Sequence, residues 1–128
     1  MRRVPAFRFL AITLLAALTA CAGKLEQPRS FLVYFDTDSA ALTPDGTRVV
    51  GEITAAVNDV SPSKVVVAGR ADGSTAHDAT LADQRATAVM QALTQKGVPA
   101  SKLEKEADAP PSGRTGVAAH QVVVTLLP

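Results

Sequence analysis

The stretch Phe31-Leu-Val-Tyr-Phe35-Asp-Thr-Asp-Ser39-Ala-Ala-Leu-Thr43-Pro44 decides the fold. Its first five residues are apolar or aromatic, a pattern that predicts a β-strand. Asp36 to Ser39 are turn formers that close this strand. Thr43 followed by Pro44 is a helix-start signal, because threonine caps free backbone N–H groups and proline suits the first helical position. The chain therefore enters its domain as strand, turn and helix.

The helix that starts at Pro44 has an apolar stripe at three- and four-residue steps, which is typical of a helix packed on a core. The stripe consists of Val49, Val50, Ile53, Val57 and Val60. Ser61-Pro62 predicts the end of this helix. Residues 64–70 then read Lys-Val-Val-Val-Ala-Gly-Arg, and valine on both faces of this strand predicts a central place in a sheet.

A second helix is predicted from about Asp78 to Lys96, with Gly97 as its C-cap. Its buried side carries Leu81, Val89 and Leu93. Three further segments follow: a charged edge strand at residues 102–106, a loop at 108–113 and a last strand at 121–126. The order strand, helix, strand, helix, strand, strand predicts an α+β fold, with a mixed four-stranded sheet and two main helices packed on it.

The N-terminal segment predicts export and attachment to a membrane. Arg2 and Arg3 precede a short apolar run at residues 9–18, and small residues follow before Cys21, the only cysteine. This pattern is typical of a secretory signal and is shorter than a transmembrane helix. The cysteine at the expected cleavage point resembles the lipobox of bacterial lipoproteins, in which the thiol carries lipid. The resemblance implies a signal peptide at 1–20, a lipidated tether at 21–29 and a folded domain at 30–128.

Composition limits the function classes. The chain has 13 basic and 12 acidic residues, and three of the arginines lie in residues 1–20, so the mature form has 10 basic against 12 acidic residues. This balance lacks the clustered basic charge of a nucleic-acid-binding protein. Ser74, His77 and Asp78 are the residue types of a hydrolase triad, but the sequence has no nucleophile elbow. Two histidines and one lipidated cysteine do not make a zinc site. We therefore expect no enzyme activity, no cofactor and no metal.

One pair of residues remains as a candidate site. Asp72 follows the second strand, and Arg85 lies early in the second helix, on the same stripe as Leu81 and Val89. Arginine in that place is either a rim residue that extends into solvent or a guanidinium held at the mouth of a cleft. A plain Asp72–Arg85 salt bridge between loop and helix is the alternative to a ligand site.

Four segments in this order resemble the OmpA-like C-terminal domain family, which includes small peptidoglycan-associated lipoproteins. The similarity covers nearly all of residues 31–126. The segments are Phe35-Asp-Thr-Asp-Ser-Ala-Ala-Leu-Thr-Pro-Asp-Gly46, Val65-Val-Val-Ala-Gly-Arg-Ala-Asp72, Leu81-Ala-Asp-Gln-Arg-Ala86 and Gly97-Val-Pro-Ala-Ser-Lys-Leu103. The resemblance implies a two-layer βαβαββ sandwich.

The resemblance also implies a ligand, the diaminopimelate side chain of the peptidoglycan stem peptide. Asp72, Asp78, Leu81 and Arg85 would form the binding site. The ligand ends in an ammonium and a carboxylate, so a carboxylate can accept from the first and a guanidinium can donate two parallel bonds to the second. With alanine rather than aspartate after Cys21, the implied location is the periplasmic side of the outer membrane.

Two hypotheses for function stay open. In the first, the protein binds peptidoglycan non-covalently and links membrane to wall, which Asp72 and Arg85 favour. In the second, it is an OmpA-like adaptor without wall binding that works in an envelope protein complex. The short tether favours the second, as does the sequence Ala119-His-Gln-Val122, which stands where the family has an asparagine and two arginines.

Overall fold

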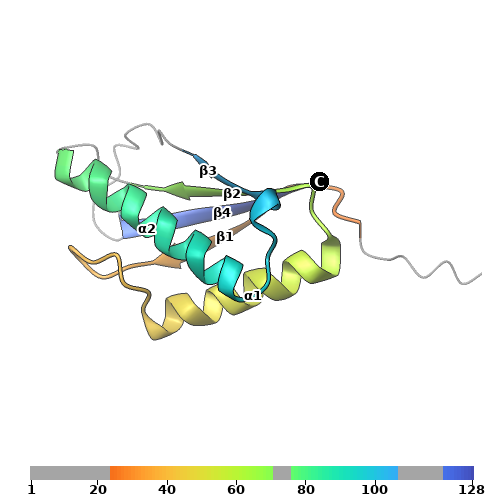
Figure 1. Cartoon of the computed structure of the whole chain (residues 1–128), viewed down its shortest axis with the longest axis horizontal. Helices are drawn as coiled ribbons and strands as arrows, with labels where there is room; N and C mark the ends of the chain where they lie inside the picture. Colours follow the sequence, from red (N-terminus) through yellow and green to blue (C-terminus); the bar gives the residue numbers. More distant parts are fainter. Residues whose placement is uncertain (1–23, 71–75, 107–119) are drawn as a thin grey trace, which may run out of the picture.

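The structure is a computed structural model that describes residues 24–70, 76–106 and 120–128 (Figure 1). Its strands are β1 (Arg29–Tyr34), β2 (Lys64–Gly69), β3 (Leu103–Glu106) and β4 (Gln121–Leu127). Its helices are α1 (Pro44–Val60), α2 (Ala76–Gln95) and the short 3-10 helix η1 (Ala100–Lys102). The expected signal peptide and the loop at 108–113 lie outside the described residues. In the part that is described, no helix is long and apolar enough to cross a membrane.

The four strands form one mixed sheet in the order β1-β4-β2-β3. β4 pairs antiparallel with β1 and with β2, whereas β3 pairs parallel with β2. Figure 1 shows α1 and α2 together on one face of this sheet. The predicted α+β fold, with a mixed four-stranded sheet and two main helices, is therefore confirmed. The central place of β2 and the edge place of the charged strand β3 are confirmed as well.

This topology gives the domain two different ends. β1, β2 and β3 all run in the same direction, because β4 is antiparallel to both of its neighbours. Both helices run back the other way (Figure 1). One end, called the loop end here, holds residues 36–43 after β1 and the first turn of α2. The other, called the tether end, holds the start of β1, the start of β2 and the end of β4, where Arg29 pairs with Leu126 and Lys64 with Leu127.

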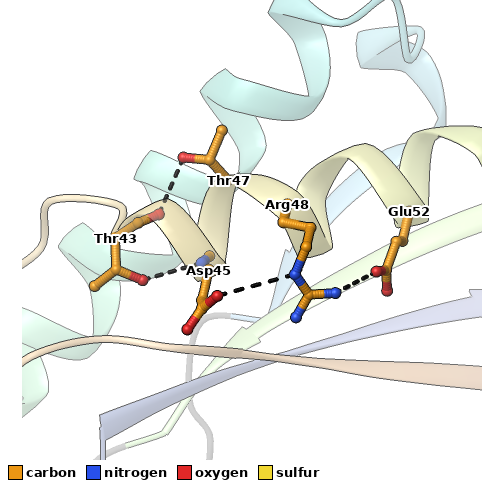
Figure 2. Close-up of polar contacts among 6 residues, drawn as sticks. Thr43, Asp45, Thr47, Arg48 and Glu52 are labelled. Atoms are coloured by element: carbon orange, nitrogen blue, oxygen red, sulfur yellow. Dashed lines mark hydrogen bonds and ion pairs between the residues drawn. The ribbon is translucent and has the colours of Figure 1, made fainter.

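Helix α1 begins as its sequence predicts. The Thr43 hydroxyl oxygen accepts a hydrogen bond from the Gly46 N–H at 3.0 Å, and Pro44 occupies the first turn. The Thr47 hydroxyl donates back to the Thr43 carbonyl at 3.1 Å, as Figure 2 shows. The first bond satisfies an N–H group that the helix N-terminus leaves open, whereas the Thr43 carbonyl already accepts from the Thr47 N–H. At the other end of the helix, Ser61 adopts a left-handed conformation with φ 43° and closes it.

Helix α2 ends at a glycine, again as predicted. Gly97 has φ +98°, a conformation that costs glycine little. Its N–H donates to the Thr94 carbonyl, and the Val98 N–H donates to the Leu93 carbonyl. Val98 is itself buried next to the core. The turn therefore stops the helix and leads the chain into η1 and β3.

The core lies between the sheet and the two helices and is built almost entirely from aliphatic side chains. Fully buried members include Val50 and Ile53 of α1, Val89 and Leu93 of α2, and Val65, Val67, Val122, Val124 and Leu126 of the sheet. Val66 points to the other face of β2 and is only half-buried. The helix stripe from Val49 to Val60 does pack on this core, with Val49 and Val60 at its margin.

Leu25 is an unexpected member of this core. The sequence assigned residues 21–29 to a polar tether, but the Leu25 side chain is only 7% exposed and belongs to the buried cluster. The packed part of the chain therefore includes Leu25, which lies in the segment expected to be a tether. Lys24, directly before it, is exposed.

We expect Leu25→Ala to lower the free energy of unfolding by about 2–4 kcal/mol, because burial and packing of a leucine side chain are lost. Leu32→Ala is the matched control. Leu32 is 42% exposed, so its truncation should cost less than about 1 kcal/mol. Urea denaturation of both variants measures the difference. Equal effects would mean that Leu25 is not part of the packed domain.

Candidate functional site

Arg85 lies at the loop end, on the buried side of α2. Its side chain is 2% exposed. The Nε–H donates to the Ser39 carbonyl oxygen at 2.7 Å, and Nη2 donates to the Asp36 carbonyl oxygen at 2.9 Å. The guanidinium also lies over the Phe35 ring, 5.6 Å from its centroid. Arg85 is thus a buried bridge between α2 and the loop after β1, and the alternative of a solvent-exposed rim residue is wrong.

The loop after β1 presents its carbonyl groups to this arginine because it is tightly turned. The Ser39 N–H donates to the Asp36 carbonyl at 3.3 Å, and Asp38 between them has φ 54°. The Ser39 hydroxyl oxygen accepts from the Ala41 N–H at 3.1 Å. Backbone carbonyls beyond the end of a strand have no ladder partner. The guanidinium supplies donors for two of them.

Burial and the neighbouring charges shift the pKa of Arg85 in opposite directions. Burial lowers the pKa of its guanidinium, because desolvation disfavours the charged form, while the carboxylates of Asp38 and Asp78 raise that pKa again. The ordinary pKa of arginine is so high that the group remains a cation near neutral pH. Asp78 is half-buried in the first turn of α2, where a negative charge suits the helix N-terminus.

A close backbone contact places α2, and with it Arg85, against the sheet. Gly69 is the last residue of β2, and a Cβ atom added to it would lie 2.1 Å from the Ala82 carbonyl oxygen. The neighbouring helix residues are small or apolar and buried: Leu81, Ala82 and Ala86. The absence of a side chain at Gly69 therefore lets α2 lie directly on the carboxyl end of β2, three residues before Arg85.

A surface groove of about 560 Å³ adjoins the same loop. It runs between β1 and the start of α1, and Phe35 and Asp36 contribute both to this groove and to the surroundings of Arg85. Its other lining residues include Tyr34, Thr43, Asp45 and Arg48. Figure 2 shows Arg48 between Asp45 and Glu52, with which it forms ion pairs along the exposed side of α1. The groove therefore has an aromatic side and a charged side.

The fold and the sequence together decide the family. A family model described as the OmpA family matches residues 34–119, more than half of the chain. The chain belongs to the OmpA family. The match covers the last residue of β1, both main helices, β2 and β3. It also covers the loop after β1, whose carbonyl groups accept hydrogen bonds from Arg85.

Three individual proteins that are similar to this chain share 19% to 31% of the aligned residues with it. Outer membrane protein A of Shimwellia blattae is 31% identical over 88 residues, which is 66% of this chain and 36% of that protein. This chain thus spans about a third of the length of that relative. The cell wall anchor of the T6SS from Pseudomonas aeruginosa has a TM-score of 0.63 at 19% identity, over 78% of this chain and 81% of that one. The peptidoglycan-associated lipoprotein from Burkholderia pseudomallei has a TM-score of 0.60 at 19% identity, over 74% and 87%. At such identities the two structures show the shared fold alone.

The structure describes three of the four site residues that the OmpA-like resemblance implies. Arg85 and Asp78 interact electrostatically at the loop end. Leu81 lies one turn before Arg85 and is buried, so it contributes apolar surface. Asp72 lies outside the described residues, and so does any Asp72–Arg85 salt bridge. In the described part of the chain, no cluster of three or more His, Cys, Asp or Glu residues is placed to hold a metal ion.

Sequence reasoning missed the partners of Arg85 in the loop after β1. Phe35 supplies the ring beneath the guanidinium, and Asp36 and Ser39 supply backbone carbonyls. A signal for them existed, because β1 and β2 run in the same direction and their carboxyl ends meet at one end of the sheet. Residues directly after both strands were therefore candidates for one site. The side-chain pattern alone does not reveal that the loop contributes backbone atoms.

We expect Gly69→Ala to destabilise the domain by about 3 kcal/mol or more, since the new methyl group would overlap the Ala82 backbone, which cannot move alone. Gly51→Ala is the matched control, because a Cβ at Gly51 in α1 meets nothing within 4 Å. Removing a helical glycine there should stabilise the protein by about 0.5–1 kcal/mol. Thermal unfolding of the two variants tests this. A Gly69→Ala variant as stable as the parent would contradict the close packing of α2 on β2.

Proposed function

We propose that this OmpA family protein binds peptidoglycan non-covalently through its loop end and has no catalytic activity. The observation that carries the proposal is the Arg85 guanidinium, which two backbone carbonyls and one aromatic ring hold in a fixed plane. A held guanidinium is already oriented for a carboxylate, so less conformational entropy is lost when the ligand binds. The names of two structural neighbours, a cell wall anchor and a peptidoglycan-associated lipoprotein, agree with this function.

The proposed ligand is the diaminopimelate side chain of the stem peptide. The two carbonyl bonds use two of the five N–H groups of Arg85. The remaining N–H groups would donate to the ligand carboxylate, and the Asp72 carboxylate would accept from the ligand ammonium. Asp78 adds a second negative charge near the cation, and Leu81 adds an apolar wall. The site thereby offers both charges that the zwitterionic ligand needs.

The burial of Arg85 limits how tightly this site can bind. Because only 2% of the side chain is exposed, the ligand carboxylate reaches the guanidinium only after its surroundings open. Part of the binding free energy is spent on that opening. Each charge-assisted hydrogen bond still contributes about 1.5–3 kcal/mol. Attachment to a membrane beside the wall would offset a modest affinity, because it raises the effective concentration of the ligand.

The proposed location is the periplasmic side of the outer membrane. Residues 1–20 would be removed and Cys21 would carry the lipid. One acyl chain gives only marginal attachment, whereas two or more hold a protein stably. A membrane-bound OmpA family domain at that surface would connect the outer membrane to the wall.

We expect the chain from residue 22 to 128 to sediment with purified diaminopimelate-type sacculi, and we choose this start because it keeps Leu25. Asp72→Asn and Arg85→Lys should each weaken retention roughly tenfold or more, in line with the loss of one charge-assisted bond. Arg29→Lys is the matched control, since Arg29 is an exposed arginine at the tether end, away from the candidate site. It should bind as the parent does. Thermal unfolding of each variant separates lost binding from lost folding, because Arg85 also supports the loop.

Sacculi of the lysine type sharpen this test. Lysine lacks the second carboxylate of diaminopimelate, so the parent should retain less of them, and Arg85→Lys should remove that preference. Folded Asp72→Asn and Arg85→Lys variants that bind like the parent would exclude this site. A folded parent that binds neither wall would instead favour the adaptor function in an envelope complex.

For the anchor, we expect the full chain expressed in a Gram-negative host to be processed and acylated at Cys21. Intact-mass spectrometry should find a chain that starts at residue 21 with added acyl groups. Cys21→Ser should lack these groups, because only the thiol accepts the diacylglyceryl moiety. Membrane fractions washed with high salt should retain the parent protein. A parent protein without acyl groups would mean that Cys21 is not a lipidation site.

A further inference from the structure

The burial of Leu25 changes what the N-terminal attachment can do. Lys24 is exposed, and the Leu25 side chain is buried in the core, four residues before Arg29, which pairs with Leu126 at the tether end. Between Cys21 and Leu25 there are four peptide units, which reach at most about 14 Å when fully extended. A lipid on Cys21 would therefore keep the tether end within that distance of the bilayer surface.

The domain itself is longer than this reach. The 17 residues of α1 span about 26 Å at the helical rise of 1.5 Å per residue. α1 runs from the loop end to the tether end, where Arg29 of β1 lies opposite Leu126 of β4 (Figure 1). Arg29, four residues after Leu25, and Arg85 thus lie at opposite ends of the domain. A lipid anchor on Cys21 would therefore not connect the candidate site to the membrane through a long flexible linker.

The two ends of the domain differ in charge. This difference disfavours an orientation in which the loop end lies against the membrane. The tether end carries exposed basic side chains together with the acidic Glu26 and Asp59. One of the basic residues, Lys64, forms an ion pair with Glu104 at 2.6 Å. These exposed basic residues are Lys24, Arg29 and Lys64, and Lys102 beside them is half-buried. Among the described residues of the loop end, four carboxylates outnumber the three arginines, of which Arg48 is exposed, Arg70 half-buried and Arg85 buried. The carboxylates belong to Asp36, Asp38, Asp45 and Asp78. Anionic lipid headgroups therefore disfavour contact with the loop end more than with the tether end.

We infer that the tether end is a bilayer-contact surface, and that the loop end with Arg85 points away from the membrane at a distance set by the length of the domain. The inference rests on the proposed lipid anchor at Cys21. Its partner is the headgroup layer of the bilayer that holds the anchor. The rigid domain then takes the place of a flexible linker between membrane and wall. The wall is bound where its distance from the bilayer is no more than roughly the length of α1 plus the short tether.

The test uses the acylated chain in vesicles of phosphatidylcholine with about one quarter phosphatidylglycerol, an anionic surface. A fluorophore is attached to Asn58→Cys near the end of α1 or to Ala41→Cys in the loop before α1, two exposed positions at opposite ends of the domain. Cys21 is acylated and does not react with the label. A nitroxide quencher on the lipid headgroups should quench the label at position 58 several-fold more than the label at position 41.

Two changes should remove this difference. A flexible Gly/Ser insert of about 12 residues between Ala22 and Gly23 adds roughly 19 Å of average span. Leu25→Ser releases the N-terminal segment from the core without lengthening the chain. Equal quenching at both positions in the parent, or a difference that survives the long insert, would overturn the inference. A chain without acyl groups would overturn the anchor and the inference together, whereas sacculus binding is measured separately and depends on neither.

Discussion

The buried guanidinium of Arg85 connects two parts of the chain that are 46 residues apart. It joins α2 to the loop after β1 through the carbonyl oxygens of Ser39 and Asp36. A buried cation is costly unless it is hydrogen-bonded. Here backbone carbonyls, the Phe35 ring and two nearby carboxylates share that task. The contact is possible only because Gly69 lets α2 approach β2 closely. The geometry of the loop end therefore depends on one arginine and one glycine.

Arg85 supports the loop after β1 and is also the proposed ligand-binding cation. A site with a precisely oriented guanidinium can therefore still bind its ligand weakly. The bonds that hold the guanidinium in place also cover it, so the ligand competes with parts of the protein. A flexible surface arginine would be accessible, but it would lose more rotamer freedom on binding. A buried one loses little freedom and reaches the ligand only when the loop end opens. If the protein is held next to the wall as proposed, the many identical stem peptides of that polymer would offset a modest affinity.

Local signals in the sequence predicted most of the fold correctly. Thr43-Pro44 and Gly97 act through backbone chemistry within a few residues, and the valine stripes follow the helix and strand periods directly. Two features needed tertiary information. Leu25 stands alone among polar residues, so no periodicity reveals that it is buried. The burial of Arg85 depends on a loop 46 residues away, whose contribution comes from backbone atoms that every residue has. The implied partnership with Asp72 came from family resemblance and stays a prediction.

The direction of the strands decides what kind of ligand suits the loop end. Both main helices begin there, and helix N-termini carry partial positive charge. With Arg85 alone, such an end would favour simple anions. Asp36, Asp38, Asp45 and Asp78 lie at the same end and offset that field. A purely anionic ligand meets these carboxylates, and a purely cationic one meets the guanidinium and the helix termini. A group with adjacent ammonium and carboxylate satisfies both, so the balance of charges at the loop end favours a zwitterion over either ion alone.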